Sequence, residues 1–209
     1  MVSTYAKHSL LTLWGLAAVV AGGVLTSFHQ PFQAPDTRII ALAPTFPGGQ
    51  WGVIHVLSGS CACSQRVMRH LLERHRLNGL VEQVVLLDGA EPYLQESAQL
   101  IARLEQADFA VRHLRIRDLP ADYGLRGVPL LLIASPARQL AYMGGYGPSG
   151  DQDAGILARL QTGASPHALP ILGCAVGSRI RALADPFGWK YPERPKQWRN
   201  SSDRFQELR

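Results

Sequence analysis

The feature that most constrains the fold is a junction at which an apolar segment, two cysteines and a helical pattern follow one another without a gap. The junction covers residues 51–75 and reads WGVIHVLSGSCACSQRVMRHLLERH. Residues 51–57 alternate and favour β-branched or apolar types, which predicts a β-strand. Residues 64–75 carry apolar side chains at helical spacing, which predicts a helix. The two cysteines, Cys61 and Cys63, therefore lie where a strand turns into a helix.

Strand and helix patterns continue to alternate along the rest of the chain. Residues 80–87 form a near-continuous apolar run, typical of a strand that is buried on both faces. A helix is predicted over residues 95–106 and a strand over residues 110–116. Residues 128–146 predict two strands joined by a tight turn, and residues 150–160 predict a final helix. This order indicates an α/β fold with a mixed sheet and helices on both of its faces.

The N-terminal region contains Ser9–Phe28, a segment without a charged residue over 20 positions. A helix of this length can cross a hydrocarbon core of about 30 Å. Lys7 precedes the segment and the first charges after it are Asp36 and Arg38, so the positive-inside rule places the rest of the chain outside the cytoplasm. The segment ends in the bulky Phe28 rather than at a small-residue cleavage site. This favours an uncleaved anchor over the competing interpretation, a cleaved signal peptide.

The predicted organisation has four parts. Residues 1–28 form the anchor, and residues 29–36, which contain two prolines, form a linker. Residues 37–164 form the α/β domain, and residues 165–209 form a C-terminal extension. Net charge is +5, but acidic residues interrupt the basic and aromatic C-terminus and no nucleic-acid motif accompanies it. We therefore expect no nucleic-acid partner.

Two local motifs resemble the thioredoxin fold. One is the strand-to-helix junction at Cys61. The other covers residues 119–146, LPADYGLRGVPLLLIASPARQLAYMGGY, where a tyrosine-glycine turn precedes a glycine-valine-proline triplet, a strand, a turn and a strand ending in glycine. With its anchor, the chain is most similar over residues 37–164 to the membrane-tethered TlpA-like thiol-disulfide oxidoreductases of bacteria. The resemblance implies a single-pass protein of the bacterial inner membrane whose domain faces the periplasm.

The same resemblance assigns a role to Val128 and Pro129. Pro129 corresponds to the cis-proline that faces the active-site cysteine in this family. Cis peptide bonds are essentially a proline feature, and a proline at the start of a strand can expose the backbone of Val128 to a bound peptide. The alternative interpretation is an ordinary edge proline that opens a strand.

The active-site motif departs from the family pattern of two cysteines separated by two residues. The sequence here is CACS, so two registers are possible. In one, Cys63 matches the second cysteine and Ser60 replaces the first. In the other, Cys61 matches the first cysteine and Ser64 replaces the second. Met68 lies four residues after Ser64, as a methionine often does in TlpA-like proteins, so the second register is preferred.

The position before a helix suits Cys61 to act as the attacking thiol. Unpaired backbone N–H groups and the positive end of the helix dipole favour the thiolate form of a cysteine there. Residues two apart on a helix point about 200° away from each other, so a bond between Cys61 and Cys63 requires Cys61 to lie outside the helix. Such a bond would be strained and labile.

The third cysteine lies in the C-terminal extension. Cys174 follows LPILG and precedes a predicted helix over residues 175–183, which stops before Pro186. We expect this cysteine at a helix N-terminus, folded back over the first site. It would then resolve a mixed disulfide on Cys61 or Cys63, or serve as a third metal ligand. The alternative is a small buried apolar residue.

The leading hypothesis is a thiol-disulfide oxidoreductase without a cofactor that acts on protein disulfides or dithiols. Cys61 attacks, Cys63 or Cys174 resolves the mixed disulfide, and Val128 with Pro129 aligns the partner chain.

A rival hypothesis is a Cu(I) metallochaperone on the same fold, because soft thiolates suit Cu(I). Cys61 and Cys63 would bind the ion, and the site would be completed by Cys174 or by a histidine, for which the candidates are His55, His113 and His167. A third hypothesis is a binding module with a degenerate active site, since Ser64 replaces a cysteine.

Overall fold

The computed structural model describes residues 4–29, 31–42, 49–89, 93–185 and 190–191. The chain divides into two compact units. The larger unit spans Gln30–Ile180, and the smaller one combines Met1–His29 with Arg181–Arg209. The larger unit therefore includes the first part of the predicted C-terminal extension together with the predicted α/β domain.

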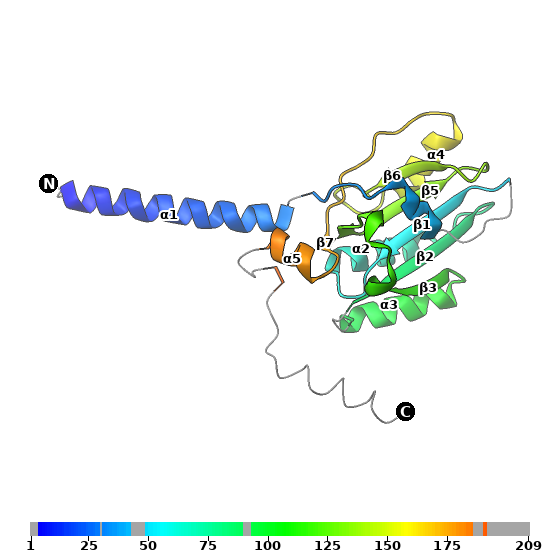
Figure 1. Ribbon diagram of the computed structural model, residues 1–209, viewed down its shortest axis with the longest axis horizontal. Coiled ribbons are helices and arrows are strands. Elements are labelled where there is room, and N and C mark those ends of the chain that lie inside the picture. Colours follow the sequence, from blue (N-terminus) through cyan, green and yellow to red (C-terminus); the bar gives the residue numbers. More distant parts are fainter. Residues whose placement is uncertain (1–3, 30, 43–48, 90–92, 186–189, 192–209) are drawn as a thin grey trace, which may run out of the picture. The chain divides into compact units, whose positions relative to one another are not determined.

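A five-stranded mixed sheet forms the centre of the larger unit (Figure 1). The strand order is β3-β2-β1-β5-β6, with three neighbouring parallel strands and two antiparallel ones. The strands are β1 (Gly52–Leu57), β2 (Val81–Asp88), β3 (Ala110–Arg115), β5 (Leu130–Ala134) and β6 (Leu140–Gly144). Strands β1, β2 and β5 are buried along nearly their whole length. The apolar run of β2 predicts this burial, whereas the alternation of residues 51–57 does not.

Three α-helices pack against one face of this sheet. They are α2 (Ala62–Arg74), α3 (Gln95–Gln106) and α4 (Asp153–Gln161). Their apolar side chains share one hydrophobic core with alternate residues of the strands. Short 3₁₀ helices cover the other face, namely η1 (Thr37–Leu42), η2 (Ile116–Asp118) and η3 (Ala121–Tyr123). The predicted thioredoxin-like α/β fold is confirmed, with 3₁₀ helices in place of α-helices on the second face.

A second, two-stranded sheet joins the C-terminal extension to the domain. It pairs β4 (Gly127–Val128) with β7 (Cys174–Ala175) in antiparallel orientation. The prediction of a helix starting at residue 175 is therefore wrong, because β7 satisfies its backbone by pairing with β4. Gly177 then adopts a positive φ of 83°, and α5 (Ser178–Ala184) begins directly after it.

The smaller unit contains α1 (Thr4–His29), the longest helix in the described part of the chain. Its segment His8–Leu25 has a mean hydropathy of 1.7, so by length and composition it is able to cross a membrane. Large apolar side chains such as Leu10, Leu13 and Trp14 are exposed along it. The predicted apolar span is thus present as one helix.

Candidate active site

The junction between β1 and α2 holds Cys61 at the position that caps the helix. Cys61 has an extended backbone, with φ −117° and ψ 118°, and α2 begins at the next residue. Its carbonyl oxygen accepts the N–H of Gln65 at 3.1 Å, and its own N–H donates to the carbonyl of Ser58 at 3.2 Å. The Cys61 side chain is fully buried. Cys61 therefore lies at the N-terminus of α2, just outside the regular helix.

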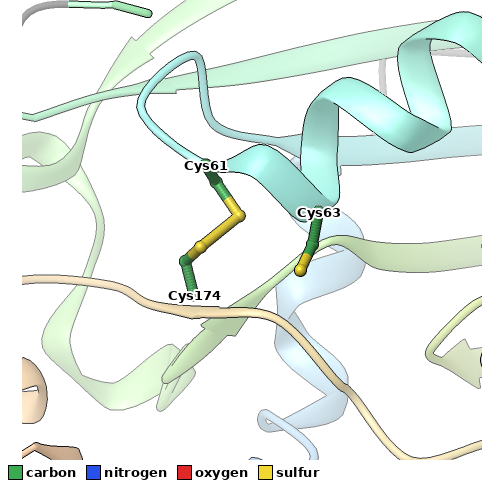
Figure 2. Close-up of side chains that lie close together, drawn as sticks. All are labelled: Cys61, Cys63 and Cys174. Carbon is green, nitrogen blue, oxygen red and sulfur yellow. A yellow bond between two sulfur atoms is a disulfide. The ribbon is translucent and has the colours of Figure 1, made fainter. Parts of the chain in front are cut away.

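A disulfide joins Cys61 to Cys174 (Figure 2). The two Cα atoms lie 5.9 Å apart, although 113 residues separate the cysteines in the sequence. Cys174 lies in β7 rather than at a helix N-terminus, and it is partly exposed. Of the two partners that the sequence left open for Cys174, the structure pairs it with Cys61.

Cys63 is the free cysteine of the site. It lies in the first turn of α2, is partly exposed, and lies beside the disulfide in Figure 2. The sulfur atoms of Cys61, Cys63 and Cys174 all lie within 4.8 Å of one another. Three sulfurs therefore converge on one small region, and a thiol on Cys63 lies close to an existing disulfide.

The segment before β5 completes the site. The Val128–Pro129 peptide bond is cis, as the resemblance implied. The Val128 carbonyl oxygen lies 3.9 Å from the Cys61 sulfur. In the register of the small sheet, Val128 also pairs with Cys174. Val128 thus adjoins both halves of the disulfide.

Ser64, which the preferred register aligns with the second cysteine of the family pattern, is buried on the inner side of α2. Its hydroxyl accepts the backbone N–H of Ser58 at 3.1 Å. This hydrogen bond ties the end of β1 to the first turn of α2, so Ser64 helps to hold the loop that carries Cys61.

A buried polar network lies under α2 on the same face of the sheet. His55 on β1 is fully buried, with Nδ1 2.6 Å from the Tyr146 hydroxyl and Nε2 2.9 Å from a Glu82 carboxylate oxygen. Both ring nitrogens are therefore engaged in the core. Burial raises the pKa of Tyr146 well above its ordinary value.

Arg74, on α2, joins two buried carboxylates in this network. Its guanidinium hydrogen-bonds to Glu82 and lies 2.7 Å from an Asp153 carboxylate oxygen. Burial alone would raise the pKa of Glu82, but hydrogen bonds to His55 and Arg74 and their positive charges lower it from 4.5 to about 2. Burial alone would also raise the pKa of Asp153, but the electrostatic attraction of His55 and Arg74 lowers it.

Sequence inspection missed this network, although one signal was present. Glu82 stands as a charge inside the apolar run LVEQVVLL, where an unpaired carboxylate would be very costly. His55, Glu82 and Asp153 come close enough together to resemble a metal site. Arg74 already supplies positive charge to both carboxylates, so the group is better explained as an ion-pair network that holds α2 and α4 on the sheet.

The histidines predicted as extra ligands do not join the cysteines in the convergent groups of the described residues. His55 belongs to the buried network. His113 is exposed, with Nδ1 3.3 Å from the Asp88 carboxylate, and His167 is exposed on the loop before β7. Among the described histidines, cysteines and acidic residues, the group that includes Cys61 consists of Cys61, Cys63 and Cys174.

Comparisons with known proteins add the following findings. No protein-family model matches the chain, and no curated protein matches it. An uncharacterized conserved protein from Geobacillus kaustophilus has a similar structure with 16% identity and a TM-score of 0.48, covering 72% of this chain and 94% of that one. The thioredoxin domain of a thiol-disulfide oxidoreductase from Bacteroides vulgatus shows 14% identity and a TM-score of 0.38, covering 52% of this chain and 79% of that one.

Proposed function

We propose that the chain is a membrane-anchored, TlpA-like thiol-disulfide oxidoreductase that exchanges disulfides with partner proteins outside the cytoplasm. The observation that carries this proposal is the disulfide between Cys61, at the cap of α2, and Cys174, beside Val128. A disulfide at a helix N-terminus next to a free thiol suits exchange better than structural stapling, because a thiolate that leaves there is stabilised by the helix.

The exchange proceeds in two steps, each an attack of a thiolate on a disulfide. In the reduced protein the Cys61 thiolate attacks one sulfur of a partner disulfide, and the other partner sulfur leaves as a thiolate. The Cys174 thiolate then attacks the Cys61 sulfur of this mixed disulfide. The partner leaves with two thiols, and the Cys61–Cys174 disulfide found in the structure is the product. The reverse sequence oxidises a partner dithiol.

Val128 and Pro129 serve as the positioning residues of this scheme. Val128 carries a backbone carbonyl 3.9 Å from the Cys61 sulfur, at the edge of the short strand β4. An extended partner segment that pairs with this edge would bring its sulfur to Cys61.

Helix α1 supplies the proposed anchor. It has one apolar segment of sufficient length, and the charge distribution around that segment favours a periplasmic domain. This location also suits the disulfide, because disulfides persist in oxidising compartments.

The test is a disulfide-exchange assay on the full chain with a glutathione-linked peptide as the substrate. Cys61→Ser should abolish exchange, because the attacking thiol is lost, whereas Cys63→Ser should retain it. Full exchange by the Cys61→Ser variant would overturn the proposal.

A second candidate function, Cu(I) binding, is favoured by one observation, the convergence of three sulfur atoms within 4.8 Å. After reduction, Cys61, Cys63 and Cys174 would offer three soft thiolates to the ion. The Cys61–Cys174 disulfide excludes this use while it is closed. Titration of the reduced protein with Cu(I) tests the idea: a tight one-to-one complex that is lost in Cys63→Ser supports it, and weak binding unaffected by that substitution contradicts it.

A further inference from the structure

The short strand β7 occupies the edge of β4, next to Cys61. Val128 pairs with Cys174 and Gly127 with Ala175 in antiparallel register. The Val176 N–H extends this pairing by donating to the Arg126 carbonyl at 2.8 Å. The chain's own segment therefore takes the place beside Cys61 that a partner segment needs in the proposed function.

The fit of β7 to this edge depends on a glycine. A Cβ atom added to Gly173 would collide with the carbonyl oxygen of Val128 and approach the Pro129 ring. Gly173 is buried, and the residue after it forms the disulfide. The place beside β4 thus accepts an extended segment in which a residue without a side chain comes immediately before the cysteine.

The segment before β7 is attached separately from β7. The Leu169 carbonyl accepts the Gly145 N–H at 2.8 Å, and the Ile171 carbonyl accepts the Phe32 N–H at 2.9 Å. Ile171 is buried in the core on the second face of the sheet. These contacts lie outside the β4–β7 pairing, so they can persist when β7 leaves.

We propose that β7 is an intramolecular stand-in for the partner, held by the Cys61–Cys174 disulfide and released when that bond is reduced. The two residue pairs and the buried side chains of Ala175 and Val176 hold β7 noncovalently, and the disulfide adds a covalent bond that reduction removes. The attachment at Leu169 and Ile171 then keeps Cys174 close to Cys61 at a high effective concentration. The partner is an extended protein segment with a glycine immediately before its reactive cysteine.

The redox cycle that follows from this proposal rests on the proposed function. A protein dithiol donates two electrons to the Cys61–Cys174 disulfide and becomes a disulfide itself. With both thiols free, β7 leaves β4, and a partner segment takes its place. The Cys61 thiolate attacks one sulfur of a partner disulfide, and the other partner sulfur leaves as a thiolate. Cys174 then returns with β7 and attacks the Cys61 sulfur, so the bound partner sulfur leaves as a thiolate and the Cys61–Cys174 disulfide forms again.

The experiment uses the peptide ILGCAV, residues 171–176, with its cysteine activated as a mixed disulfide with thionitrobenzoate. The protein is the full chain in detergent with Cys63→Ser and Cys174→Ser, so that Cys61 is the remaining thiol and no disulfide holds β7 on β4. Cys61 attacks the peptide sulfur, and the released thionitrobenzoate carries away the electron pair and is measured by its absorbance.

Because β7 has already left β4 in this background, adding Gly173→Val should leave the rate with ILGCAV unchanged. Gly155→Ala is the matched control, because a Cβ there meets no atom within 4 Å, and it should leave the rate unchanged. The peptide ILVCAV should react about tenfold more slowly than ILGCAV with the Gly173→Val protein, because its valine would meet the Val128 carbonyl.

Equal rates for ILGCAV and ILVCAV, or a rise of about tenfold on adding Gly173→Val, would overturn the inference while leaving the proposed function intact. Failure of every variant to react would overturn both, because Cys61 would then not be the attacking thiol.

Hydrogen exchange on the full chain without substitutions provides a second test that does not depend on a folded variant. Reduction should remove the protection of the Val176 amide and keep that of the Gly145 amide, which binds Leu169. Unchanged protection of Val176 after reduction would show that β7 is a fixed part of the sheet, and would overturn the inference.

Discussion

The substitution Glu82→Gln tests the buried network quantitatively. Glutamine keeps the shape of the side chain and a hydrogen-bonding oxygen but removes the negative charge that Arg74 and His55 stabilise. A tenfold change in proton affinity corresponds to about 1.4 kcal/mol, so lowering the pKa of Glu82 from 4.5 to about 2 corresponds to about 3 kcal/mol of stability. We therefore expect the variant to unfold more easily by about 3 kcal/mol at neutral pH.

The stability difference between the two proteins should depend on pH. The pKa of Glu82 is lower in the folded protein than in the unfolded chain, so the charged carboxylate stabilises the folded state. This contribution is fully present above pH 4.5 and is lost as the pH falls from 4.5 through about 2, below which the carboxylate is protonated in both states. The difference between the two proteins should therefore shrink across this window.

The assay is urea unfolding of the full chain in detergent, followed by the fluorescence of Trp51, which packs against the core. The other three tryptophans are replaced by phenylalanine in both proteins. Glu105→Gln, at an exposed position on α3, is the control and should change stability by less than about 0.5 kcal/mol. A Glu82→Gln variant as stable as the parent at neutral pH would show that the charge of Glu82 does not stabilise the folded state.

Three further substitutions or deletions test the disulfide, the close approach at Gly145 and the anchor. Cys63→Ser should retain the Cys61–Cys174 disulfide, which peptide mapping by mass spectrometry can show; loss of that bond would contradict the pairing. Gly145→Ala should lower the free energy of unfolding by about 1–3 kcal/mol in the urea assay, because its Cβ would collide with the Pro170 backbone; an unchanged midpoint would contradict this. The full chain should remain in membranes after carbonate extraction, whereas a chain lacking residues 1–29 should be released; release of both would argue against the anchor.

The elements with long periodic patterns were predictable from the sequence. The helix expected over residues 95–106 begins and ends where α3 does, and the strand expected over residues 51–57 differs from β1 by one residue. Hydrophobic periodicity is strong in both segments because each packs a long row of side chains into the core. The fold class followed from the order of such segments.

The missed features depend on contacts between distant residues. Strand β7 has two residues, too few for any periodicity, and it forms only because β4 and Cys61 lie beside it. The buried network joins His55 to Tyr146, 91 residues further along the chain. The sequence shows the polar residues of this network but not which of them meet.

The most direct test of the proposed function is disulfide mapping of the full chain across a series of glutathione redox buffers. We expect the Cys61–Cys174 disulfide to open as the buffer becomes more reducing and to close again as it becomes more oxidising. Cys63 should remain a free thiol at equilibrium throughout. Free thiols on Cys61 and Cys174 in every oxidising buffer, or a bond between them that no glutathione buffer opens, would contradict a role in disulfide exchange.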